Sequence, residues 1–135
     1  MSCFWDAILN RIQEEDKKKY FNIFNMSLTP HNFVVILKEI NKKTNNVLWN
    51  NEELTEKQLN ENKECIDNYD KNSINNGYDC STFEPILFLL VEYLNITIHH
   101  EYNKNVIIYS HKTTNRYTII RIIKYIFYSV KVYFI

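Results

Sequence analysis

Cys3, close to the first residue of the chain, is the side chain whose type and setting best suit nucleophilic chemistry. Phe4, Ala7, Ile8 and Ile12 follow it at the spacing of a single helical face. A helix N-terminus carries roughly half a positive charge and unpaired N–H groups, and both stabilise a thiolate. The pattern therefore predicts a reactive thiol at the mouth of a buried helix. The alternative is an exposed cysteine without a role.

A thiol nucleophile needs a base to accept its proton. The histidines of the chain are His31, His99, His100 and His111. His111 falls in a predicted loop late in the chain, from which it could reach Cys3, although a loop histidine without a role fits equally well. His99 and His100 are adjacent on a predicted strand and must point to opposite faces. Because no metal-ligand spacing and no glycine-rich phosphate loop occurs, we expect no metal and no cofactor.

The other two cysteines are weaker candidates. Cys80 also precedes a predicted helix, but that helix is expected in the centre of the domain, which favours a structural role. Cys65 lies in a polar helix and is expected to be inert. Three cysteines form no regular disulfide framework, and no signal-peptide pattern precedes them. We therefore expect an intracellular protein.

The charge of the chain is divided unevenly. Residues 104–135 carry six basic and no acidic side chains, while the first 103 residues carry the 16 acidic ones. This indicates a basic sheet on an acidic helical layer, or a surface for an anionic partner. The apolar run 85–94 is too short to cross a membrane, and the run 118–135 is interrupted by charges. We expect no membrane partner and regard nucleic acid as unlikely.

The order of the elements predicts an α+β fold in a single domain, residues 1–135. Helices are expected at 3–19, 30–40, 56–69 and 85–94. Thr29-Pro30, Thr55 with Gln58, and Ser81 with Glu84 are the expected helix starts. Strands are expected at 95–99, 106–109, 116–122 and 124–135, forming a C-terminal antiparallel β-meander. Residues 47–49 form a short strand or a loop.

Two stretches resemble the ovarian-tumour (OTU) family of cysteine proteases, in the minimal form found in large DNA viruses. Cys3-Phe4-Trp5-Asp6-Ala7-Ile8-Leu9 is similar to the family's nucleophile block. The run 83–98 is similar to its helix that is entered by an acidic residue and leads directly into a strand. The resemblance implies a papain-like fold, Cys3 as nucleophile, His111 as candidate base, and ubiquitin or a ubiquitin-like protein as substrate.

The chain departs from the family at two places. Met1-Ser2 stand where the family has Asp-Gly before the cysteine, and Lys112 follows His111 where an aromatic residue is expected. Either His111 is a displaced base, or the end of the domain was lost and the chain is an inactive relative. The rival interpretation is a non-enzymatic viral protein. It would bind a host protein or another anionic partner through its basic C-terminal strands, one of which would be an exposed edge.

Overall fold

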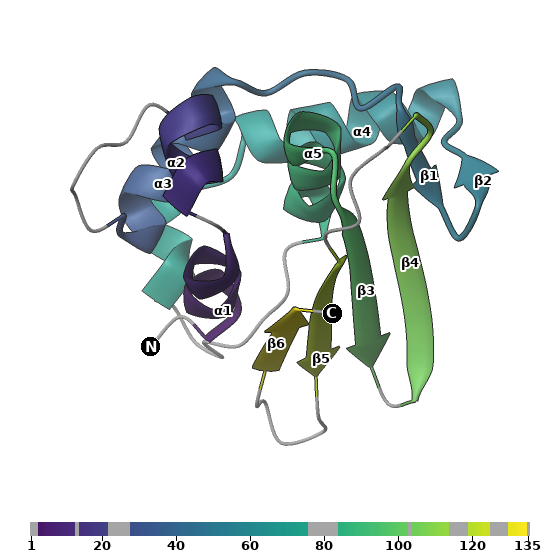
Figure 1. Ribbon diagram of the computed structural model, residues 1–135. Coiled ribbons are helices and arrows are strands. Elements are labelled where there is room, and N and C mark those ends of the chain that lie inside the picture. The colour runs from purple at the N-terminus through teal and green to yellow at the C-terminus, as the bar shows by residue number, and fades with distance from the viewer. Residues whose placement is uncertain are drawn as a thin grey trace.

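Helices precede most of the sheet along the chain, so the protein is α+β (Figure 1). The computed structural model describes residues 3–12, 14–21, 28–75, 84–102, 104–113, 119–124 and 130–134. It describes the backbone alone for 119–124, 130–134, Cys3, Ala7, Glu14, Tyr20, Phe21, Ser73, Asn75 and Tyr102. The helices are α1 (Cys3–Arg11), α2 (Glu14–Phe21), α3 (Pro30–Glu39), α4 (Glu56–Asp67) and α5 (Pro85–Leu94), with a 3-10 helix η1 (Lys71–Asn75). None of the helices described is long and apolar enough to span a bilayer.

The strands form one sheet in the order β2-β1-β4-β3-β5-β6. Their bounds are β1 (Val47–Trp49), β2 (Glu52–Glu53), β3 (Thr97–Tyr102), β4 (Asn105–His111), β5 (Ile119–Lys124) and β6 (Val130–Phe134). The predicted meander is wrong in one respect, because β5 pairs with β3, and in parallel. The reason is that β1 occupies the other side of β4, so β5 finds its partner beyond β4.

The single helix predicted over residues 3–19 is two helices. The helical bonding of α1 ends where the Ile12 N–H donates to the Ile8 carbonyl, with Ile12 buried. The charged run that follows has no apolar stripe to continue the buried face of α1. It forms α2, which packs near α5 instead.

Two of the three predicted helix starts are confirmed. Thr29 Oγ1 accepts the N–H of Asn32 at the start of α3. Thr55 and Gln58 form a reciprocal capping box at the start of α4. The third predicted start, at Ser81, lies outside the described residues. At α5 the residue before the first turn is Glu84, and its side chain does not cap the helix.

The centre of the domain is α5, as the sequence predicted. Eight of its ten residues are buried, including Glu92. They pack against the side of the sheet that carries Ile98, His100 and Tyr109. His100 is 7% exposed and its neighbour His99 is half-buried on the opposite side, which confirms the predicted alternation. That opposite side also carries Val106, which is 48% exposed.

Candidate functional site

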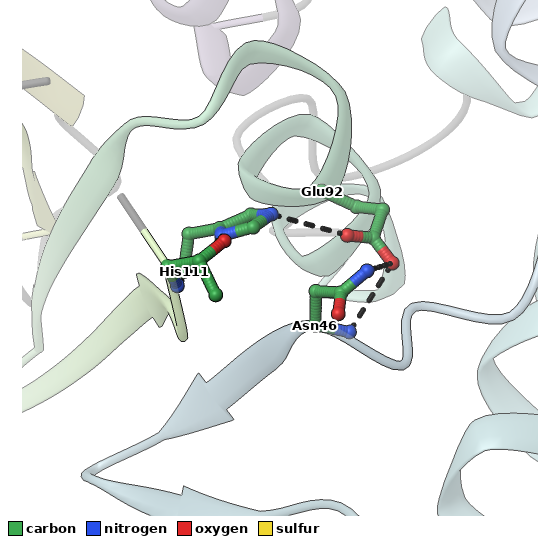
Figure 2. A network of polar contacts seen from close by, with 4 residues as sticks. Asn46, Glu92 and His111 are labelled. Carbon is green, nitrogen blue, oxygen red and sulfur yellow. Dashed lines mark hydrogen bonds and ion pairs between the residues drawn. The ribbon is translucent and has the colours of Figure 1, made fainter. Parts of the chain in front are cut away.

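A polar cluster joins three segments that are distant in sequence at the buried carboxylate of Glu92. Figure 2 shows Asn46 and His111 each directed toward one of its oxygens. Asn46 donates to Oε1 from its backbone N–H at 3.2 Å and from Nδ2 at 3.4 Å. His111 Nε2 lies 3.4 Å from Oε2. The cluster therefore ties α5 to the start of β1 and the end of β4.

The local backbone explains this convergence. β1 and β4 are antiparallel with Val47 opposite His111, so Asn46 and His111 lie at the same end of the strand pair. The Lys112 N–H also donates to the Asn46 carbonyl at 2.7 Å. Glu92 is the one charged residue in a helix that is otherwise apolar apart from the Tyr93 hydroxyl. Its side chain, 3% exposed, has polar partners at the same end of both strands.

Both ring nitrogens of His111 are engaged. Nδ1 accepts the backbone N–H of Thr113 at 3.1 Å, and Thr113 Oγ1 lies 3.2 Å from the same atom. A neutral imidazole that accepts at Nδ1 carries its proton on Nε2, which then donates to Glu92. In this arrangement the ring offers no lone pair to a substrate. The cluster acts as a polar latch between helix and sheet.

The electrostatic effect of Glu92 reaches its neighbour on α5. Burial and then the Glu92 charge raise the pKa of Tyr93. Lys112, next to His111 in sequence, points to a different partner and lies 2.8 Å from Glu53 on the surface. Hydrogen bonding and the charge of Lys112 lower the pKa of that carboxyl. Among the described contacts of Asn46, Glu92 and His111, none is with the side chain of a lysine or arginine.

Cys3 and His111 belong to elements at different places along the sheet. Helix α1, which begins at Cys3, packs on β6 and α3, whereas His111 ends β4 beside β1. Strands β3 and β5 lie between β4 and β6. The distance from β4 to β6 is therefore three strand spacings, or roughly 14 Å. Because the Cys3 side chain lies outside the described residues, its pairing with His111 stays a prediction.

The other sequence candidates take no part in the latch. Cys80 lies outside the described residues. Cys65 is exposed on α4 with a free thiol. His31 lies in the first turn of α3 and is half-buried. Within the described part of the chain, no group of three histidine, cysteine, aspartate or glutamate side chains could hold a metal ion.

Sequence reasoning missed Glu92, the residue that organises the latch. The available signal was a single carboxylate inside the run Ile86 to Leu94, where burial without a partner would be costly. A buried carboxylate in a central helix requires hydrogen-bond donors. A histidine at the end of a strand is a common donor of this kind. Asn46 gave no such signal, because it sits in a polar run of lysine, threonine and asparagine residues.

The two edges of the sheet differ in a way that bears on partner binding. At one edge β2 has only two residues, both glutamates. At the other edge β6 has five residues, Val-Lys-Val-Tyr-Phe, and pairs on one side with β5. Short or charged edge strands resist pairing with other chains, while longer apolar ones favour it.

Comparisons of the chain with family models, curated proteins and solved structures found no match.

Proposed function

We propose that this protein is a non-enzymatic interaction module that binds an acidic, extended protein segment along β6. The observation that carries the proposal is the asymmetry of the sheet edges: β6 is the longer edge strand and contains Lys131 between two valines. An added strand would pair with the backbone of β6, and its side chains would set the specificity.

Charge supports an acidic partner. The chain carries six basic and no acidic side chains from residue 104 onward. A lysine in the middle of an edge strand opposes pairing with a neutral or basic strand, because its charge would have to be brought close to that strand without compensation. A glutamate or aspartate on the incoming strand removes this cost and adds attraction.

The engagement of His111 also supports binding over catalysis. A catalytic base must release a ring nitrogen, and here both nitrogens contact Glu92 or Thr113. On this proposal the protein is an inactive relative of the OTU-like proteases, with an intracellular, viral setting as the sequence suggests. The papain-like assignment of the fold belongs to the same proposal.

The test uses a fluorescent peptide of alternating glutamate and valine and measures its binding by anisotropy. We expect Lys131→Glu to weaken binding by roughly tenfold or more. The matched control is Lys57→Glu, at an 84% exposed lysine on α4, which should leave binding unchanged. A peptide with every backbone nitrogen methylated keeps the charges but offers no N–H group with which to pair as a strand. If that peptide binds as well as the parent, edge pairing is excluded.

A second candidate, OTU-like thiol hydrolysis, is favoured by one specific contact. The 3.4 Å approach of Glu92 to His111 gives the candidate base an orienting carboxylate, as such hydrolases need. Cys3 would attack the isopeptide carbonyl of a ubiquitin conjugate. A ubiquitin probe with a C-terminal thiol-reactive group tests this. Labelling lost in Cys3→Ala, and retained in Cys65→Ala and Cys80→Ala, would establish the hydrolase; no labelling of the folded protein would reject it.

A further inference from the structure

Two adjacent hollows lie on the helical side of the molecule, far in sequence from the β6 edge. The first, about 420 Å³, is lined by residues of α3 and of the turn after α4: Val35, Lys38, Glu39, Tyr69, Asp70 and Lys71. The second, about 440 Å³, is lined by Glu61, Glu64, Cys65, Asn68, Tyr69 and Asp70. Because Tyr69 and Asp70 line both, the two hollows lie side by side, and together they are called the Tyr69 groove.

The groove has a fixed apolar floor. The Tyr69 ring packs on buried Trp5, with ring centroids 5.7 Å apart, and Lys38 Nζ donates to the Tyr69 carbonyl at 2.9 Å. The space beneath Tyr69, bordered by Trp5, Leu37 and Ile66, is too small for a water molecule. A ligand in the groove therefore has no room beneath the tyrosine. Val35, 38% exposed, provides an apolar contact beside it.

The charges of the groove differ from one end to the other. In the α3 hollow, Lys38 and Lys71 balance Glu39 and Asp70. In the α4 hollow the charged residues among the described lining are acidic, namely Glu61, Glu64 and Asp70. Glu64 is exposed, and within the described part of the chain the ion pair of Glu61 is a long 3.8 Å contact with the exposed Lys57. The α4 end therefore attracts cations, while the Val35 end favours an apolar group.

We propose that the Tyr69 groove binds a short peptide segment of a partner protein that carries aliphatic side chains followed by arginine or lysine. The aliphatic side chains lie between Val35 and Tyr69, and the cationic side chains reach Glu61 and Glu64. This partner is chemically opposite to the acidic strand proposed for β6, and the two sites share no residue. The groove proposal does not rest on the proposed function.

The probe for this site is the tetrapeptide Ac-Leu-Leu-Arg-Arg-NH₂, titrated into the ¹⁵N-labelled full chain and followed by NMR chemical shifts. We expect saturable shifts at the amides of Val35, Glu64 and Tyr69. Ac-Leu-Leu-Glu-Glu-NH₂ tests the acidic end, and Ac-Ala-Ala-Arg-Arg-NH₂ tests the apolar end. Each should bind several-fold more weakly than the parent.

Matched variants distinguish binding in the groove from nonspecific binding elsewhere on the protein. Val35→Asp should abolish the shifts, whereas Val106→Asp, at a similarly exposed valine on the sheet, should leave them intact. The remaining spectrum of each variant reports whether it is folded, and Glu64→Lys provides a second, surface-only substitution. Equal binding of the glutamate peptide, or equal loss in Val106→Asp, would overturn the proposal. Concentration-dependent shifts at the same amides without peptide would assign the groove to a second copy and overturn it too.

Discussion

Glu92 on α5 and His111 at the end of β4 face each other across 3.4 Å, with side chains 3% and 11% exposed. Glu92→Ala removes the acceptor from both His111 and the Asn46 N–H. Leaving the part-buried Asn46 N–H and the largely covered His111 ring without this acceptor should lower the free energy of unfolding by roughly 1–2 kcal/mol. Urea denaturation measures this loss. The control is Glu53→Ala, at a surface carboxylate whose loss should change stability little.

The same pair makes a second prediction about coupling. The double variant Glu92→Leu with His111→Leu replaces both polar partners by apolar groups. The double variant should lose less stability than the two single variants added together. Each single variant leaves one polar side chain without its partner, whereas the double variant removes both. Losses that simply add would mean that the two side chains do not interact.

The turn between β1 and β2 tests two adjacent asparagines against each other. Asn50 and Asn51 have φ values of 49° and 67°, the left-handed conformation that glycine adopts without cost. Asn51→Gly should therefore be neutral or slightly stabilising. Asn50 also accepts the Ile108 N–H through Oδ1 at 2.8 Å, so Asn50→Gly should lose about 1 kcal/mol. Thermal unfolding of the two variants compares them, and equal melting temperatures would contradict the assigned bond.

The capping box of α4 should contribute measurably to stability. Thr55 Oγ1 accepts the Gln58 N–H at 3.1 Å, and Gln58 Oε1 accepts the Thr55 N–H at 2.8 Å. Thr55→Ala should cost about 1 kcal/mol, while Thr55→Ser keeps the hydroxyl and should cost almost nothing. Urea midpoints of the two variants give the comparison. A serine variant as unstable as the alanine variant would point to packing of the threonine methyl instead.

Tyr109 predicts how stability changes at alkaline pH. Burial raises its pKa above the ordinary value of 10.0, and the Glu84 carboxylate, which accepts its hydroxyl at 3.0 Å, raises it further. A raised folded-state pKa adds stability that is present below pH 10.0 and is lost as the pH rises above it. Tyr109→Phe should reduce the alkaline loss, at a cost of about 1 kcal/mol at neutral pH.

Urea midpoints between about pH 9 and pH 11 test this prediction. Tyr93→Phe is the useful comparison. Burial also raises the pKa of Tyr93, and the charge of the nearby Glu92 raises it further. Phenolate absorbance in the folded protein gives a second measurement. If Tyr109 ionised near pH 10 without unfolding, its burial against Glu84 would be contradicted.

Local signals in the sequence predicted local structure well. Thr29-Pro30 and Thr55 with Gln58 begin helices as expected, because capping depends on residues three apart. The apolar run 85–94 predicted the central helix, since a helix apolar on every side has to be buried. The alternation at His99 and His100 likewise follows from strand geometry alone.

Non-local pairing could not be predicted in this way. Nothing in residues 119–124 distinguishes a strand that pairs with β4 from one that pairs in parallel with β3. That choice depends on β1, a three-residue strand far away in sequence, which pairs with β4. The latch could not be predicted from the sequence for the same reason. Asn46, Glu92 and His111 come together only when β1, α5 and β4 are assembled.

The contact between α1 and β6 has a consequence for how the chain folds. These elements span residues 3–11 and 130–134, and β6 reaches α1 only after β5 has paired with β3. Contacts between residues so distant in sequence form slowly, because most of the chain must be ordered before the loop can close. During synthesis, the part of α1 that contacts β6 therefore stays open to chaperones until β6 is made.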